Sequence, residues 1–511
     1  MVSLNKTKFF DLIILALFCV LSFGIFIPFI GLYSDDWVFL SVFQKFGHQG
    51  LTQYYQTNRP VLGWLFQVTM PIFGKSIFAW HFFALLAVFL CSISVRKLIL
   101  LLWPEERLLS VIGGILFIVY PGFTLLPLSI TFGHTYLVYL FFLLSTIFLV
   151  QAFQNPRKQW IYTFLSLLFA AANLFMMEYF FCLTFVQPFI LWFFFRDKKF
   201  PFFRNVWNTI KFYTPWILVI LISIIWRVFI FKYQTYNYSL TNIAAIKNDF
   251  FSGLLTIFTS FLSDIFKTGF LVWFEPAKFI FENKSQITLM VFTVVFIISG
   301  TLISFLIFRT YLKDTDETNR PIKKQGIPIS LILLSLAGWP FWAIGLKVSL
   351  NGFNSRFTLP FIIGSVFLII SFFSFLRKRW VVVAISSILV GIALGKQVIT
   401  IDQFHKEYKS LTSYMNQLHA RIPGLQPGAF IISNEMPFPH FSYATLSSII
   451  DWFYSPNATS MELDHVFVYS KDPFEKLLSK EFTYNNVNFK FSGSIDKSIS
   501  TVILFDKNPT Q

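Results

Sequence analysis

Long apolar segments alternate with short polar connections over residues 1–399. Because a helix needs about 20 apolar residues to cross the hydrocarbon core of a bilayer, each segment of this length predicts one membrane-spanning helix. The pattern predicts about 11 such helices. They cover residues 9–30, 77–103, 108–126, 133–153, 160–176, 180–195, 210–231, 287–308, 331–346, 359–376 and 381–399. Residues 1–399 are therefore predicted to form an all-α, polytopic transmembrane domain.

One further apolar segment, residues 250–281, contains Asp264, Lys267 and Glu275. A single crossing at this point would place the basic connection that follows the next helix on the opposite side of the membrane from the other basic connections. We therefore expect a re-entrant hairpin or an interfacial helix here, which keeps the sides consistent.

The composition changes after residue 399 and becomes that of an ordinary soluble sequence. Residues 405–421 predict a helix, and short runs of β-branched and aromatic residues at 429–432, 466–469 and 501–505 predict buried strands. Residues 400–511 are thus predicted to form a small α/β domain.

The basic residues fall in alternate connections between the apolar segments. The basic connections hold Lys6 and Lys8; Arg96, Lys97 and Arg107; Arg157 and Lys158; Arg196, Lys198, Lys199 and Arg204; Arg309, Lys313, Arg320, Lys323 and Lys324; and Arg377, Lys378 and Arg379. Since such connections stay on the cytoplasmic side, the alternation predicts a multi-pass protein of the cell membrane with a cytoplasmic N-terminus. The C-terminal domain is then extracytoplasmic.

The overall composition agrees with this class of protein. Hydrophobic residues make up 55% of the chain and charged residues 13%, a balance that is not typical of soluble globular proteins. The net charge of +16 would suit a nucleic acid, but the basic residues lie in scattered connections, so we expect no nucleic-acid partner. The three cysteines lie within apolar segments and are expected to be packing residues.

Two adjacent carboxylates, Asp35 and Asp36, follow the first apolar segment and should lie at the membrane–water boundary. Paired negative charge is costly there unless a metal ion, a cation or a substrate uses it. Seven other ionisable residues fall at the same predicted depth: Arg59, His81, His134, Glu178, Arg227, Lys347 and Arg356. Because charges within a membrane need partners, these residues predict a shared polar cavity that opens outward.

Carboxylates and cations at one depth suit a reaction between a lipid phosphate and a hydroxyl. A carboxylate can accept the proton of the attacking hydroxyl, and arginine or lysine can hold the phosphate as it leaves. The expected donor is a sugar on a polyprenyl phosphate, whose tail lies in the bilayer together with other membrane lipids. No Gly-rich loop of the kind that cradles nucleotide phosphates occurs in the sequence.

An outer Asp-Asp pair after the first helix, followed by Arg-Pro-Val-Leu-Gly-Trp-Leu at residues 59–65, resembles the GT-C membrane glycosyltransferases. The most similar branches are the family 39 protein mannosyltransferases and the aminoarabinose and lipopolysaccharide-core transferases. The resemblance implies that Asp35 and Asp36 act as catalytic base or as ligands of a divalent cation, Mg²⁺ or Mn²⁺. It also implies that Arg356, in the pair Ser355-Arg356, grips the carrier phosphate.

Each candidate residue also has a purely structural interpretation. Asp35 and Asp36 could be a solvated pair or a helix cap, and His81 and His134 are more often packing residues than ligands. Arg59, Arg227 and Lys347 could reach the interface as anchors, and Glu178 could cap a helix.

The sequence therefore predicts a glycosyltransferase. It would move a sugar from a polyprenyl-phosphate donor to a hydroxyl of a lipid, glycan or protein acceptor on the extracytoplasmic side. Arg59, His134, Glu178, Arg227, Lys347 and Arg356 are the predicted substrate-binding residues. The alternatives are a transporter or flippase, and a polymerase, of lipid-linked sugars. A transporter would be expected to show inverted repeats and charges near the middle of the membrane.

Overall fold

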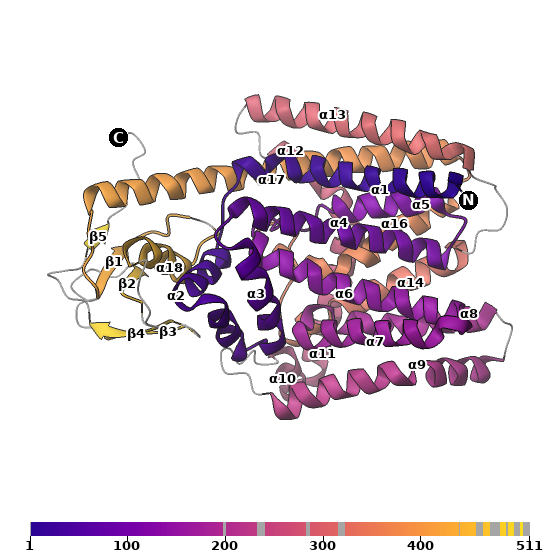
Figure 1. Cartoon of the computed structure of the whole chain (residues 1–511). Helices are drawn as coiled ribbons and strands as arrows, with labels where there is room; N and C mark the ends of the chain where they lie inside the picture. The colour runs from indigo at the N-terminus through magenta and orange to yellow at the C-terminus, as the bar shows by residue number, and fades with distance from the viewer. Residues whose placement is uncertain are drawn as a thin grey trace.

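The computed structural model of the chain describes residues 2–197, 201–231, 241–282, 287–314, 322–438, 440–455, 463–470, 481–486, 489–494 and 501–503. Most of the described residues lie in helices that run roughly parallel or antiparallel in one bundle (Figure 1). The longer ones are α1 (Val2–Ser22), α2 (Asp35–Gln56), α3 (Pro60–Phe73), α4 (Ile77–Leu102), α5 (Arg107–Ile118), α6 (Ser129–Gln154), α7 (Gln159–Met176), α8 (Val186–Asp197), α9 (Phe202–Ile225), α11 (Phe250–Gly269), α13 (Ile287–Thr310), α14 (Ile322–Ala337), α16 (Ile362–Phe375), α17 (Arg379–Arg421) and α18 (Tyr443–Tyr454). Shorter α-helices are α10 (Thr241–Asn248), α12 (Glu275–Glu282) and α15 (Trp339–Ala343).

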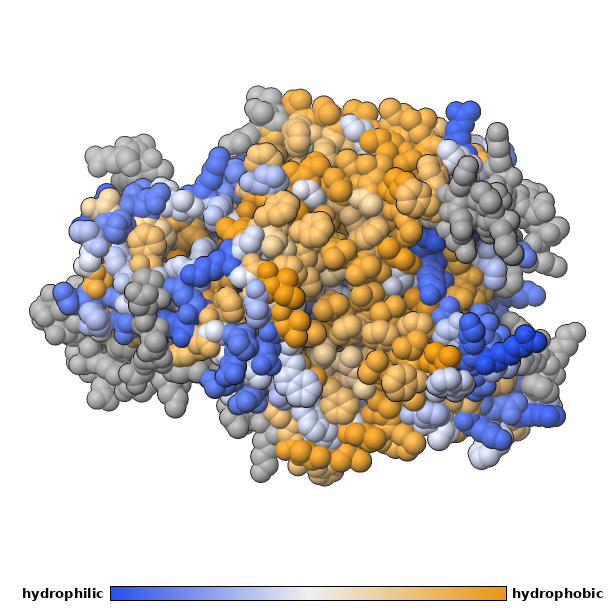
Figure 2. All heavy atoms as spheres, in the orientation of Figure 1, coloured by the Kyte–Doolittle hydropathy of each residue, from blue (hydrophilic) through white to orange (hydrophobic). Residues whose placement is uncertain are grey.

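Eleven helical segments of the described residues are long and apolar enough to cross a membrane. They are Phe9–Phe29, Ile77–Leu102, Ser129–Gln154, Pro156–Met176, Glu178–Arg196, Phe202–Ile230, Phe250–Trp273, Leu289–Thr310, Lys324–Ala343, Phe353–Phe375 and Arg379–Arg421. A broad apolar surface covers the middle of the bundle, and hydrophilic residues gather at its two ends (Figure 2). The prediction of an all-α, multi-pass membrane protein is confirmed at this level.

The predicted span at residues 108–126 is wrong in its length. The helix that forms there, α5, has only 12 residues and ends at Ile118. Pro121 and Gly122 follow in an irregular loop that continues to the start of α6. Proline offers no N–H to a helix and glycine is a poor helix former, so the apolar run cannot continue as a helix through this pair.

The segment around α11 leaves the bundle at the end where it enters. At its start, Thr241 of α10 donates to the carbonyl oxygen of Ile344 at 2.8 Å. At its far end, Glu275 of α12 accepts from Asn351, in the connection that follows α15. Between these points Gly269 packs against Leu334, in the last turn of α14, and Leu368, in the middle of α16. Both ends of the segment thus contact the connection at residues 344–351, whereas Phe250–Trp273 is itself long and apolar enough to cross a membrane, so the expected re-entrant hairpin or interfacial helix stays a prediction.

The C-terminal part begins with a continuous helix. α17 has 43 residues and passes without interruption through the predicted domain boundary at residues 399 and 400. The strands β2 (His465–Tyr469), β1 (Ala429–Ser433) and β5 (Thr501–Ile503) follow in a parallel sheet in that order. The predicted strands at 429–432 and 466–469 are confirmed, as is 501–503; residues 504–505 lie outside the described residues. Strands β3 (Glu481–Asn486) and β4 (Phe489–Ser494) form an antiparallel pair.

At one end of the bundle α18 packs against α2, and the parallel sheet lies next to α18 (Figure 1). The contact contains an ion pair between Lys45 and Asp451, whose side chains are 2% and 0% exposed. Trp37 meets Trp452 edge to face at 6.1 Å between ring centroids. We call this the Asp35 end of the bundle.

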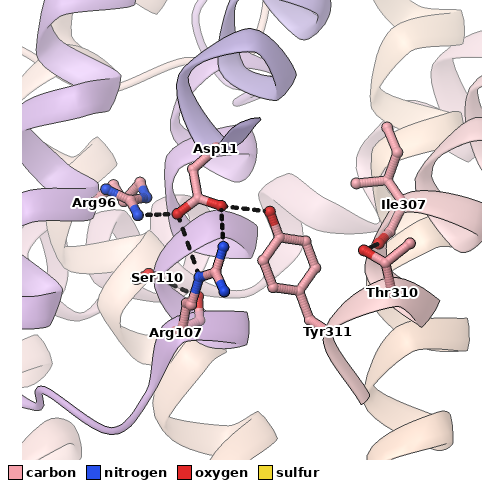
Figure 3. Close-up of polar contacts among 7 residues, drawn as sticks. All are labelled: Asp11, Arg96, Arg107, Ser110, Ile307, Thr310 and Tyr311. Carbon is pink, nitrogen blue, oxygen red and sulfur yellow. Dashed lines mark hydrogen bonds and ion pairs between the residues drawn. The ribbon is translucent and has the colours of Figure 1, made fainter. Parts of the chain in front are cut away.

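The opposite end carries arginines in a closed network (Figure 3). The buried carboxylate of Asp11, in α1, pairs with Arg96 of α4 and accepts from Arg107 of α5 at 2.9 Å. It also accepts from the hydroxyl of Tyr311 at 2.6 Å. Close by in sequence to Arg107, Glu106 binds Arg379 at 3.0 Å. We call this the basic end.

Candidate functional site

The chain is held tightly where it enters α2. Ser34, at the N-cap, has φ of 47°, the one positive φ of a non-glycine residue within the described part of the chain. Such backbone strain persists only where the surroundings hold it. Tyr33 donates its hydroxyl to the carbonyl oxygen of Phe404 in α17 at 2.9 Å, and His81 of α4 donates to the carbonyl oxygen of Gly31 at 2.8 Å. These bonds fix the position of the acidic pair.

Asp36 caps helix α6. Its carboxylate accepts the backbone N–H groups of Ile130 at 3.1 Å and Thr131 at 2.9 Å, and the Thr131 hydroxyl at 2.7 Å. An acceptor at this place satisfies N–H groups that have no partner in the helix and suits the helix dipole. Burial raises the pKa of Asp36 to about 7, against the lowering effect of these hydrogen bonds. Asp36 therefore has the structural role of a cap.

Asp35 points elsewhere and is half-buried. Burial raises the pKa of its carboxyl group, and the positive charge of Arg356 acts in the opposite direction. Within the described residues Asp35 has no hydrogen bond and no ion pair, so its carboxylate lies more than 4.0 Å from the guanidinium nitrogens of Arg356, although the two charges act on each other. The carboxylate of Asp35 thus keeps its hydrogen-bonding capacity for a ligand.

Arg356 lies on the 3₁₀ segment η8 (Phe353–Phe361), which precedes α16. Its guanidinium stacks over the rings of Phe353 at 4.4 Å and Phe357 at 4.8 Å, and its buried Nε has no partner in the described structure. Aromatic rings hold a cation in place without using its hydrogen-bond donors. The donors of Arg356 thus remain available to an anion.

The connection before η8 is held by buried polar contacts. The hydroxyl of Ser355 accepts from the backbone N–H of Thr124 at 3.3 Å and forms a second hydrogen bond, of 2.9 Å, with the hydroxyl of Thr124. Lys396 of α17 pairs with Glu275 at 2.6 Å and donates to the carbonyl oxygen of Leu350 at 3.1 Å. These contacts fix Arg356 relative to α17 and to the loop before α6.

A second set of charges lies close by. Glu178, at the start of η3 (Glu178–Phe180), accepts the Nε–H of Arg59 at 3.1 Å and pairs with a terminal nitrogen of the same guanidinium. Arg227 approaches Glu178 at 3.9 Å and donates to the carbonyl oxygen of Asn58 at 3.0 Å. Arg227 belongs to a π-helical turn, η5 (Trp226–Ile230), at the end of α9.

Two tyrosines connect the sets. Tyr55, near the end of α2, lies within range of the charges of Asp35, Asp36 and Arg59, which all act on its hydroxyl group. The guanidinium of Arg59 lies over the ring of Tyr179, 5.9 Å from its centroid, and the centroids of the Tyr179 and Phe357 rings are 6.4 Å apart. We call the resulting series the polar strip: Arg356, Asp35, Tyr55, Arg59, Glu178 and Arg227.

An apolar cavity of about 360 Å³ adjoins one end of the polar strip. It lies between α7, α9 and α15, with Phe175, Ile224 and Trp339 among its walls. Glu178 and Arg227 form its polar end. The cavity can thus hold a hydrocarbon chain whose charged head lies at the strip.

The structure brings together five of the predicted site residues outside the cap: Asp35, Arg59, Glu178, Arg227 and Arg356. His134 is buried, stacks on Phe66 at 3.8 Å, and contacts the carbonyl oxygen of Ile130 and the hydroxyl of Thr69. It therefore has the contacts of a packing residue. Lys347 is exposed in the connection after α15, and no described contact links it to the polar strip. Tyr55 was not predicted, since a tyrosine in an amphipathic helix gives no signal of its own.

The acidic pair offers few oxygen ligands for a divalent cation. The described residues hold no group of three or more His, Cys, Asp or Glu that could bind a metal ion. The oxygens of Asp36 are engaged with α6, so Asp35 would be the one open carboxylate of the pair. Mg²⁺ and Mn²⁺ usually take more oxygen ligands from a site than this. A cation ligand role stays a prediction, and no step below depends on it.

No protein-family model matches the chain, and no curated protein sequence matches it. The GT-C resemblance thus remains an expectation from the residues described above.

Proposed function

We propose that the protein is a GT-C-type membrane glycosyltransferase that moves a sugar from a polyprenyl-phosphate donor to a hydroxyl acceptor. The observation that carries the proposal is the carboxylate of Asp35, which has no partner among the described residues, within electrostatic range of Arg356, whose donors Phe353 and Phe357 leave available. In the proposed complex a sugar phosphate has its phosphate at the arginine and its anomeric carbon near the carboxylate.

The proposed reaction is a direct displacement. Asp35 accepts the proton of the acceptor hydroxyl as the hydroxyl oxygen forms a bond to the anomeric carbon. The bond from that carbon to the phosphate oxygen breaks, and the carrier phosphate leaves with the electron pair. Arg356 stabilises the charge that grows on the phosphate. The anomeric configuration is inverted, because one displacement occurs.

The remaining residues of the polar strip support binding. Arg59 and Arg227 share one carboxylate, Glu178, so this part of the strip keeps a net positive charge. The adjoining apolar cavity supports a donor with an isoprenoid tail. Asp36 acts through α6, whose N-terminus it caps, and is a positioning residue in this proposal.

The side of the membrane follows from charge. The basic connections favour a cytoplasmic location for the basic end, which puts the Asp35 end and the C-terminal α/β elements outside the cytoplasm. An acceptor lipid, glycan or protein would then approach from that side.

The test uses the purified full-length protein and a panel of polyprenyl-phosphate sugars, and it follows release of the free carrier phosphate. At least one donor is expected to be turned over, and Asp35→Asn is expected to lower the rate at least about 100-fold. Asp402→Asn is the matched control, because Asp402 pairs with Lys406 at 2.7 Å on α17, away from the strip. Full turnover in Asp35→Asn would remove the proposed base. Movement of the sugar-lipid across vesicles without bond cleavage would favour a flippase.

A further inference from the structure

A second cavity, of about 400 Å³, lies between α7, α8 and α9. Its lining combines polar side chains with aromatic rings: Gln159, Thr163, Asn208, Lys211, Phe212 and Trp216. Gln159 is the first residue of α7, whereas the last residue of that helix lies beside Glu178. The 18 residues of α7 span roughly 27 Å at 1.5 Å per residue. This cavity is therefore at the basic end, about one bilayer core away from the polar strip.

The polar groups of this cavity are open to a ligand. In the described structure the side chains of Gln159, Thr163 and Asn208 have no hydrogen-bond partner, and Lys211 has no ion pair. Pro215 in α9 has no N–H, so the carbonyl oxygen of Lys211 lacks its usual donor four residues later. The cavity thus offers both donors and acceptors beside an ammonium group.

The charge around the cavity is positive. Between residues 156 and 231 the sequence has two carboxylates, Glu178 at the other end of α7 and Asp197 at the end of α8, against eight lysines and arginines. Arg157 and Lys158 are exposed in the connection before α7, and Arg196 is exposed in the last turn of α8. An anionic ligand is favoured over a neutral or cationic one.

The depth of the cavity is marked by exposed aromatic residues. Trp160 is 74% exposed, Trp207 66% and Phe203 84%. Trp160 and Trp207 are the immediate neighbours of two cavity residues, Gln159 and Asn208. Exposed tryptophans are enriched where a membrane protein meets the headgroup layer. The cavity therefore lies at the level of phospholipid head groups.

We propose that this cavity binds the head group of an anionic phospholipid from the leaflet at the basic end. Lys211 pairs with the phosphate, Gln159 and Asn208 bond to its oxygens or to head-group hydroxyls, and Phe212 packs against the upper part of the acyl chains. Basic pockets between transmembrane helices are known to hold such lipids. The site is separate from the polar strip and does not depend on the proposed function.

The test is native mass spectrometry of the full-length protein titrated with phosphatidylglycerol, with phosphatidylcholine in parallel. Phosphatidylglycerol is expected to bind more tightly, and Lys211→Gln is expected to weaken it about fivefold, since one lysine near a lipid head group contributes about 1 kcal/mol. Lys324→Gln is the matched control, because Lys324 is an exposed lysine at the start of α14 that does not line the cavity. Inorganic phosphate is expected not to displace the lipid.

Asn208→Leu is a second variant, which removes a polar group without changing charge and is also expected to weaken binding. It provides the test if Lys211→Gln does not elute as a single species in size-exclusion chromatography. Equal affinity of the folded variants and the Lys324→Gln control for phosphatidylglycerol would overturn the proposal. Equal affinity for the two lipids, or displacement by inorganic phosphate, would do the same.

Discussion

Two carboxylates at opposite ends of the bundle have opposite surroundings. Asp11 is fully buried and has Arg96, Arg107 and Tyr311 around it (Figure 3). Asp35 is half-buried and faces Arg356 without contact. The first carboxylate uses its hydrogen-bonding capacity within the protein, which is the property of a structural group. The second keeps that capacity for something else, which is why we place the chemistry at Asp35.

The largest expected effect is on stability, at the basic end. Asp11→Ala leaves two arginines near a buried site without their carboxylate, and breaking a buried pair in this way costs about 3–5 kcal/mol. We expect a large fall in the thermal midpoint of the purified protein. Glu282→Ala is the control, since Glu282 pairs with Lys278 on the surface, where ion pairs contribute little. A midpoint for Asp11→Ala equal to that of the control would show that the network is not structural.

The next effect is on catalysis, at the Asp35 end. Arg356→Gln removes the cation proposed to hold the leaving phosphate, and kcat/KM is expected to fall about 100- to 1,000-fold. The thermal midpoint should change little, because Arg356 contacts Phe353 and Phe357 but no described carboxylate. Arg356→Lys keeps the charge and should recover part of the rate. An unchanged kcat/KM in Arg356→Gln would separate this residue from the reaction.

A smaller effect separates the two members of the acidic pair. Asp36→Ala removes the cap of α6, and loss of a cap costs about 0.5–2 kcal/mol of stability. Asp249→Ala is a matched change, because Asp249 caps α11 at Ser252 with a 3.2 Å bond at an exposed site. We expect the larger loss at Asp36, where buried N–H groups are left unsatisfied. Chemical denaturation of both variants measures the difference, and equal losses would argue against a special role of Asp36 in holding α6.

The finest distinction is the pH dependence of the reaction. Burial raises the pKa of Asp35, so the rate should rise with pH through a value above that of an ordinary aspartate. Arg356 lowers this pKa, so Arg356→Gln is expected to move the acidic limb of kcat/KM to higher pH. Lys278→Gln, on the exposed surface of α12, should leave the limb in place. A limb that shifts to lower pH in Arg356→Gln would contradict the assignment of Asp35 as base.

The transmembrane helices could be predicted because a bilayer imposes one length and one polarity on each of them. The loop at Pro121 and Gly122 was missed, since a hydrophobicity average over 108–126 does not register two residues that stop a helix. The prediction could not assign different roles to Asp35 and Asp36, because the N–H groups that Asp36 accepts lie 94 and 95 residues away. The role of Asp11 was missed for the same reason, as its partners come from three other segments.

Histidine and tyrosine show the limit of reasoning by depth. His134 lies at the predicted depth, but its ring packs on Phe66 and its nitrogens contact the protein. Tyr55 also packs on Phe66, but it was not predicted as a site residue, because it carries no charge in the sequence. The end of the bundle at which such residues gather could be predicted, whereas the direction in which a side chain points depends on contacts between distant segments.

The length of α17 has a mechanical consequence. At the first residue of this helix Arg379 pairs with Glu106, and further along the Phe404 carbonyl oxygen accepts from Tyr33. The next element in the chain is β1, the central strand of the parallel sheet (Figure 1). If α17 tilted, the sheet and the segment before Asp35 would move together, because both are attached to this helix. A macromolecule that binds the sheet would therefore change the position of the Asp35 carboxylate without contacting it.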